Sequence, residues 1–182
     1  MRSSATRSHG KRMRTLRSAL LTTIAFAELH GVAASQSPRW RKLDSPGERS
    51  LHALVYHVAY ERAFLFGGHD SDRSLWSWDG LAWHRRDSTT SPSARSALAM
   101  TYDARRERLV LFGGRDATNR FDDTWEWDGV DWTRVSGPLS PPARSSHAMA
   151  YDAARRRVVL FGGSTAAGLL DDTWEWDGAV WV

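Results

Sequence analysis

The segment Trp125-Glu126-Trp127-Asp128-Gly129 has a near copy at Trp174-Glu175-Trp176-Asp177-Gly178 and a looser one at Trp76-Ser77-Trp78-Asp79-Gly80. The second tryptophans of these copies, Trp78, Trp127 and Trp176, are separated by intervals of 49 residues, and each is followed five residues later by another tryptophan. All ten tryptophans fall in this frame, because Trp40 stands where a preceding unit would end. A fixed interval of this size is typical of a repeat architecture.

Two further features recur in phase with the tryptophans. A proline-led turn carries an arginine in each unit, and an apolar stretch ends in a glycine doublet. The arginines are Arg49, Arg95 and Arg144, and the doublets are Gly67 and Gly68, Gly113 and Gly114, and Gly162 and Gly163. We therefore predict three repeats at about residues 46–91, 92–140 and 141–182, within one repeat segment over residues 36–182.

Each unit predicts four short strands. In the third unit we expect strands over residues 145–151, 157–161 and 172–176, with Trp181 opening the fourth. The second strand is almost continuously apolar, which predicts burial of both its faces. The third alternates, so that Trp174 and Trp176 share one face, and Asp177-Gly178 then supplies turn chemistry.

One four-stranded sheet cannot cover such tryptophans by itself. Burying one tryptophan removes roughly 150–250 Å² from water, and only a neighbouring sheet packed face to face can do this. Repeated four-stranded sheets that pack radially form a β-propeller, so the predicted fold class is all-β.

The glycine doublets after an apolar strand, with a tyrosine upstream and Trp-x-Trp-Asp-Gly downstream, resemble the kelch-repeat family. The resemblance covers residues 40–182 and is to its galactose oxidase-like, compact, exported bacterial form. It implies a propeller of kelch-type four-stranded blades. About three blades are present, fewer than the roughly four to eight of closed propellers, so the propeller is incomplete. We favour a part of a longer propeller; the alternatives are two copies joined into one ring and an open arc.

The basic character of the chain is concentrated near its start. Residues 1–35 hold six lysines and arginines against one acid, whereas residues 36–182 hold 19 basic and 20 acidic side chains. Without a basic stripe the repeats do not fit a nucleic-acid partner. The basic stretch precedes the apolar run 19–27, which predicts a signal peptide or else a disordered basic leader, and which is too short for a stable membrane span. We expect a secreted or periplasmic protein.

The recurring arginines form the sharpest candidate for a ligand site. The loops before the first strand and after the second strand of a blade lie on one face of a propeller. Arg49, Arg95 and Arg144 could therefore form a ring that binds carboxylates in bidentate fashion. We favour the structural alternative, in which each arginine bonds to backbone or to an aspartate of the repeat.

The segments 69–74, 115–122 and 164–171 differ between units while the strands match. Variation on a constant scaffold is typical of specificity in repeat proteins. We expect a binding site to be lined by these loops and by the 84–91 connection. The candidate contacts in them are His69, Asp70, Arg115, Asp116, Asn119 and Arg120.

Catalytic chemistry is not indicated. The chain has no cysteine, which excludes the cysteine-crosslinked tyrosine of galactose oxidase chemistry, and the histidine spacing does not fit a metal site. We predict no catalytic, cofactor-binding or metal-binding residues. The tryptophans could stack on sugars, but their recurrence favours packing, with Trp78, Trp127 and Trp176 as structural residues of the repeat.

The predicted function is a non-enzymatic binding scaffold that is exported and engages a protein partner through its loops. The alternatives are an extracellular carbohydrate-binding module, with a glycan as ligand, and a fragment of a larger propeller enzyme. Self-association that completes a ring is a further prediction about its partners.

Overall fold

The computed structural model describes residues 45–69 and 71–182 of the chain, all within one compact unit that spans Lys42–Val182. The predicted leader over residues 1–35, Trp40 and Asp70 lie outside the described residues.

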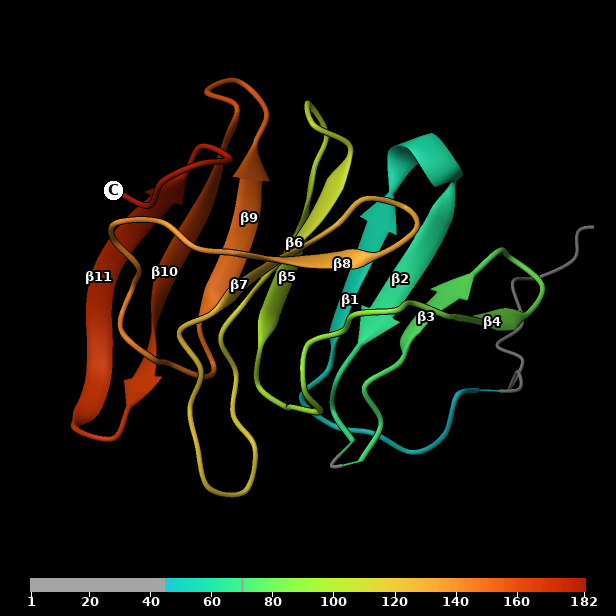
Figure 1. Cartoon of the computed structure of the whole chain (residues 1–182), viewed down its shortest axis with the longest axis horizontal. Helices are drawn as coiled ribbons and strands as arrows, with labels where there is room; N and C mark the ends of the chain where they lie inside the picture. The colour runs from blue at the N-terminus through green and yellow to red at the C-terminus, as the bar shows by residue number, and fades with distance from the viewer. Residues whose placement is uncertain (1–44, 70) are drawn as a thin grey trace, which may run out of the picture. The chain divides into compact units, whose positions relative to one another are not determined.

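Three antiparallel sheets follow one another along the chain (Figure 1). Blade one consists of β1 (Ala53–His57), β2 (Arg62–Phe66), β3 (Leu75–Trp78) and β4 (Trp83–Arg86), with the short 3-10 helix η1 (Val58–Tyr60) after β1. Blade two consists of β5 (Ala99–Asp103), β6 (Arg108–Phe112), β7 (Thr124–Trp127) and β8 (Trp132–Val135). Blade three consists of β9 (Ala148–Asp152), β10 (Arg157–Thr165) and β11 (Gly168–Trp176).

Within each sheet the strands pair in sequence order. A fourth strand begins in blade three, where Trp181 bridges Trp176 and Val182 exchanges backbone hydrogen bonds of 2.8 and 3.0 Å with Glu175. The first strands adjoin one another, β1 beside β5 and β5 beside β9. The described residues thus form three blades of an incomplete β-propeller, as predicted.

The hydrophobic core lies between consecutive blades, in two separate clusters. Side chains of β6 alternate between them, because successive residues of a strand point to opposite faces. Leu109 and Leu111 belong to the cluster shared with blade one, whereas Val110 and Phe112 belong to the cluster shared with blade three. Both faces of β6 are therefore buried, as the apolar run predicts.

Four tryptophans are almost wholly enclosed by this packing. Trp127 and Trp132 lie in the first cluster, and Trp176 and Trp181 lie in the second, each no more than 2% exposed. Their phase in the sequence follows from this role, since blades two and three each insert the same pair against the blade before them.

The aspartate of each Trp-x-Trp-Asp-Gly motif closes a tight turn. Asp79, Asp128 and Asp177 each accept hydrogen bonds of 2.8 or 2.9 Å from the backbone N–H groups two and three residues later. This is the turn chemistry that the motif predicts.

Three details of the third unit differ from expectation. The first strand begins at Ala148 instead of residue 145, because Ser146 has a left-handed φ of 58° that interrupts the extended backbone. The second and third strands pair beyond their expected ends, as far as Thr165 and Gly168. The prediction that both faces of the second strand are buried is wrong here, since Phe161 is 55% exposed and none of the described blades covers it.

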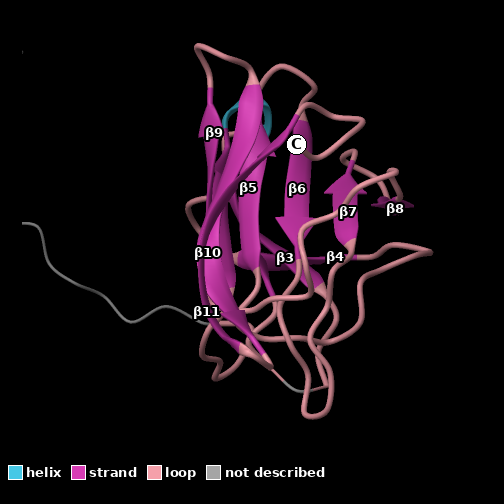
Figure 2. Ribbon diagram, turned by 90° about the vertical axis from the view of Figure 1, so that its left-hand side faces the viewer, coloured by secondary structure: helices cyan, strands magenta, loops and turns pink. Residues whose placement is uncertain are grey.

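The loops and turns gather at opposite ends of the blades. In Figure 1 the turns between first and second strands lie at the upper end, and the loops that follow the second strands lie at the lower end. Figure 2 shows the same separation from the side. The lower end is called the loop face here, and it holds the recurring arginines and the variable segments.

Candidate functional site

The arginine of each repeat lies in the turn before a first strand and reaches across its own blade. Arg95 donates to Gly113 O at 3.0 Å and to the two oxygens of Asp123 at 2.5 and 3.0 Å. Its side chain is 1% exposed and that of Asp123 is 9% exposed. The carboxylate that this guanidinium binds therefore comes from the same blade.

The same arrangement is present in blade three. Arg144 donates to Gly162 O at 2.9 Å and to both oxygens of Asp172 at 2.6 and 2.7 Å. Although the arginine is fully buried, the Asp172 side chain is 34% exposed. Charge-assisted bidentate pairs of this kind fix geometry strongly.

Blade one reaches the same contacts through a different spacing. Arg49 donates to Gly67 O at 3.1 Å and to Asp72 at 3.1 Å. Asp72 lies four residues before the tryptophan whose indole N–H it accepts, Trp76, instead of the two residues found in the other blades. Residue-by-residue alignment of the repeats misses this partner.

The paired aspartates are ionised more readily than ordinary carboxyl groups. Burial by itself would raise the pKa of Asp123, but the hydrogen bonds from Arg95 and from the Trp125 indole outweigh it and lower the pKa. The hydrogen bond from Arg144 is the main reason that the pKa of Asp172 falls to about 2. These ion pairs persist at neutral pH and hold the bases of the loops.

The glycine doublets allow consecutive blades to meet at the loop face. Gly68 N–H donates to Arg95 O at 2.9 Å, and Gly114 N–H donates to Arg144 O at 2.9 Å. Gly113 has a φ of +62°, and a Cβ placed there would lie 2.7 Å from Arg144 O of the next blade. The turns of Arg95 and Arg144 are thus each joined to their own blade by the arginine side chain and to the preceding blade by its carbonyl group.

The variable loops expose polar side chains above these fixed bases. Arg115, Asp116 and Asn119 are exposed in blade two. Asp116 closes the tip by accepting from the N–H groups of Thr118 and Asn119 at 2.8 and 2.6 Å. The buried Nε atom of Arg120 has no hydrogen-bond partner among the described residues.

In blade one, His69 is exposed, and its Nδ1 accepts from the Ser71 N–H at 3.3 Å. A hollow of about 450 Å³ lies beside it. The hollow is lined by Glu48, Arg49, Ser50, Gly68 and His69. The structure thus brings His69 next to Arg49, while Arg115, Asp116 and Asn119 form a separate exposed tip in blade two.

The 84–91 connection bonds to both neighbouring segments. Thr90 N–H donates to Asp131 Oδ1 at 3.0 Å, and Ser91 Oγ–H donates to Arg73 O at 2.8 Å. The connection therefore links the loop of blade one to the last turn of blade two.

One recurring polar group escaped the sequence reasoning. Arg106 joins Asp103 to Glu126, and in blade three Arg155 joins Asp152 to Glu175. The sequence does contain a signal for this bridge, because both units carry Asp, Arg and Glu at equivalent positions of the repeat. Blade one has His57, Tyr60 and Ser77 there instead, with the His57 and Tyr60 rings stacked at 4.3 Å.

Within residues 45–69 and 71–182, no group of three His, Cys, Asp or Glu side chains converges on a point where a metal ion could bind. Over the same residues, no helix is long and apolar enough to cross a membrane.

Comparison with known proteins gives one family. Residues 52–182 match the family described as the KLHDC2/KLHL20/DRC7 Kelch-repeats domain. No curated protein matches the chain. The match spans all three blades, and the glycine doublets, arginine turns and paired tryptophans described above lie within its bounds apart from the turn of Arg49. This chain therefore belongs to the Kelch-repeat family.

Proposed function

We propose that this chain is a non-enzymatic interaction scaffold that engages a protein partner through the variable loops of its loop face, and that it works outside the cytoplasm. Kelch-repeat domains are generally interaction modules. The observation that carries the proposal is the contrast between the loop bases and the loop tips. The bases are held by Arg95–Asp123 and its equivalents, whereas the tips differ between blades and are exposed.

The four tryptophans buried between blades are not available to stack on a glycan, and the loop tip of blade two offers polar groups instead. Sugar stacking needs an accessible aromatic face, and Trp127, Trp132, Trp176 and Trp181 are 1–2% exposed. The charged and amide side chains that the loop tip of blade two exposes are Arg115, Asp116 and Asn119. Charged and amide groups on a fixed scaffold suit the polar rim of a protein interface.

A site-specific crosslinking experiment tests this proposal. A photo-crosslinking residue replaces Thr118 at the tip of the blade-two loop in the full chain, expressed in its own host. A second version carries it at Val130, which is 76% exposed in the turn at the end of β7. We expect one discrete crosslinked protein from position 118 and none from position 130.

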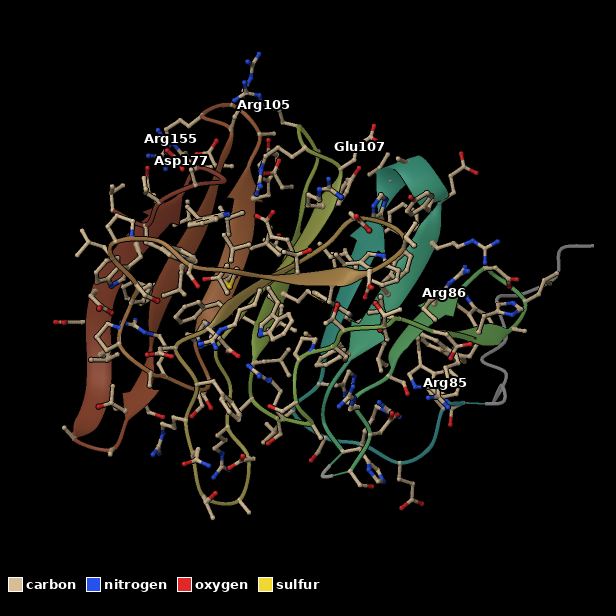
Figure 3. The ribbon with its side chains drawn as sticks, viewed as in Figure 1. Arg85, Arg86, Arg105, Glu107, Arg155 and Asp177 are labelled. Atoms are coloured by element: carbon tan, nitrogen blue, oxygen red, sulfur yellow. The ribbon has the colours of Figure 1, made fainter. Side chains whose placement is uncertain are left out.

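A matched pair of arginine variants gives the control. Arg115→Ala should abolish the crosslink, whereas Arg105→Ala should keep it, because Arg105 is exposed at the opposite end of blade two (Figure 3). Both substitutions remove one exposed positive charge, so a general charge effect would affect them equally. Equal capture from positions 118 and 130, or loss with Arg105→Ala alone, contradicts the proposal.

The proposed location rests on the basic and apolar pattern of residues 1–35. Fusing these residues to a reporter enzyme that is active only after export tests it. We expect activity that disappears when Leu20 and Leu21 are both replaced by arginine. Retention of the wild-type fusion in the cytoplasm contradicts export.

A further inference from the structure

The contact between blades two and three joins a pair of indoles to a matched set of acceptors. Trp176 Nε1–H donates to Glu126 at 3.0 Å, and Trp181 Nε1–H donates to Thr124 at 2.9 Å. The Trp181 ring also meets Phe112 edge-on, with 5.3 Å between ring centroids. Blade two thus offers its successor one aromatic contact and two hydrogen-bond acceptors.

Charged neighbours in blade two hold one of these acceptors in position. Arg106 donates to both carboxylate oxygens of Glu126, at 2.9 and 2.6 Å. The same guanidinium donates to Asp103 at 2.7 Å. This bridge directs the Glu126 carboxylate toward the indole of the next blade.

Blade three presents the same set on its outer face. Phe161 is 55% exposed, whereas its counterpart in blade two is fully buried, and Thr173 is also exposed. Arg155 donates to Glu175 at 2.5 Å and to Asp152 at 2.8 Å, which reproduces the bridge of blade two. Figure 3 shows Arg155 at one end of this blade. No described tryptophan donates to Thr173 or Glu175.

The acceptor set is not a general feature of every blade. Blade one has Leu75 and Ser77 at these positions, both buried. As a result the buried Nε1 atoms of Trp127 and Trp132, which pack against that blade, have no hydrogen-bond partner among the described residues. Blade three therefore keeps two acceptors and a supporting bridge to which no tryptophan of residues 45–69 and 71–182 donates.

The opposite end of the propeller segment presents the complementary surface. The Trp78 and Trp83 rings lie 5.6 Å apart, close to the 5.8 and 5.4 Å of the equivalent pairs in blades two and three. Leu54 and Tyr56 beside them are each 57% exposed. Their counterparts in blade two are 6% and 8% exposed, because blade one covers them.

A series of backbone hydrogen bonds joins the turns before the first strands of consecutive blades. Ala97 N–H donates to Leu51 O at 2.8 Å, and Ser146 N–H donates to Ala97 O at 2.7 Å. All three residues have a left-handed φ between 53° and 58°. The series stops at Leu51 on one side and at Ser146 on the other.

We propose that the outer face of blade three binds the blade-one face of a second copy of this chain. The indoles of Trp78 and Trp83 in that copy donate to Glu175 and Thr173, and Trp83 packs edge-on against Phe161. Leu51 N–H of the second copy donates to Ser146 O. Each contact repeats one that the chain already makes between blades two and three.

The blade count selects the number of copies. β-Propellers typically close with about four to eight blades. The three described blades of two copies together supply six, which lies within this range, whereas those of three copies supply nine, which exceeds it. The pair is therefore a closed ring with two equivalent contacts. This proposal concerns the blade faces and does not depend on the loop-face partner.

The oligomeric state tests the proposal directly. Sedimentation velocity and light scattering of the full chain should give twice the mass of one 20.5 kDa chain. Phe161→Asp should shift it to the mass of one chain, because a carboxylate would be buried against Trp83. Leu169→Asp, at a position that is 89% exposed in the same blade, is the matched control and should leave the pair intact.

Circular dichroism should show the same folded spectrum for both variants, since both positions are exposed in a single copy. A wild-type chain with the mass of one copy, or a Phe161→Asp variant that stays paired, overturns the proposal.

The absence of cysteine allows a second measurement. Ala97→Cys with Ser146→Cys calibrates disulfide formation within one chain, at a contact that the structure contains. Leu51→Cys with Ser146→Cys should form the equivalent disulfide between chains and run as a covalent dimer without reductant. Crosslinking of the calibration variant without any such dimer overturns the proposed contact.

Discussion

Replacing Arg95 by alanine removes one partner of the most deeply buried ion pair in the arginine series. Asp123, whose side chain is 9% exposed in the wild-type chain, would keep the Trp125 indole as its side-chain donor, and Gly113 O would lose its guanidinium partner. Breaking a buried pair from one side typically costs about 3–5 kcal/mol, because the other charge stays desolvated. We expect Arg95→Ala to lower the free energy of unfolding by about this amount.

In the other blades, the loss in the free energy of unfolding should be smaller where the remaining carboxylate is more exposed. Asp172 is 34% exposed, so water can solvate it after Arg144→Ala. We expect that variant to lose about 2–3 kcal/mol, less than Arg95→Ala. The double variant Arg95→Ala/Asp123→Ala leaves neither charge behind. It should therefore be more stable than the sum of the two single variants predicts, by about 1–3 kcal/mol.

Equilibrium urea unfolding, followed by tryptophan fluorescence and circular dichroism at one protein concentration, measures these differences. The slope of the free energy with urea should stay constant, which shows that the same surface unfolds in each variant. A loss of less than about 1 kcal/mol for Arg95→Ala, or a larger loss for Arg144→Ala, refutes the argument from burial.

Three further substitutions test the packing. Burial, and then the charge of Arg144, lower the pKa of His147 to about 4. Between about pH 6.5 and 4 the unfolded chain therefore binds a proton that the folded chain does not bind, and the free energy of unfolding falls as the pH drops through this window. His147→Leu should remove a pH-dependent loss on the order of 3 kcal/mol in that window, and equal slopes for variant and wild type in unfolding measured against pH would contradict it. Gly114→Ala should destabilise more than Gly80→Ala in thermal melts, because both glycines have a left-handed φ but only the first has neighbours within 3 Å of a new Cβ; equal losses would show that φ alone matters. Glu126→Ala should cost about 2 kcal/mol in urea unfolding by removing the acceptor of an interblade indole and a partner of Arg106, and an unchanged midpoint would argue against both contacts.

Much of the architecture was predictable because the repeat interval and strand alternation are local properties of the sequence. The positions of Trp127 and Trp176, the glycine doublets and the turn aspartates were enough to predict four-stranded blades. Strand ends were less predictable. The left-handed conformation of Ser146 is not marked by a special residue type in the sequence. Ser146 adopts it where its N–H donates to the preceding blade.

The sequence predicted the residues of the candidate site better than the contacts between them. The recurrence of Arg49, Arg95 and Arg144 pointed to these residues and to an aspartate of the repeat as one partner. In blade one that partner is Asp72, at a different sequence offset, which only the folded loop reveals. The Asp103–Arg106–Glu126 bridge joins residues that lie near one another only after the strands pair.

The sequence alone was sufficient for the family and the blade, since interval, alternation and turn chemistry act within a few tens of residues. Whether a residue of the repeat is buried or exposed depends on which blade lies beside it. Phe112 is buried and Phe161 is 55% exposed, although each ends the apolar stretch of its repeat directly before the glycine doublet. The difference arises because burial is a property of two packed sheets, and blade three presents one face without a neighbour among the described residues.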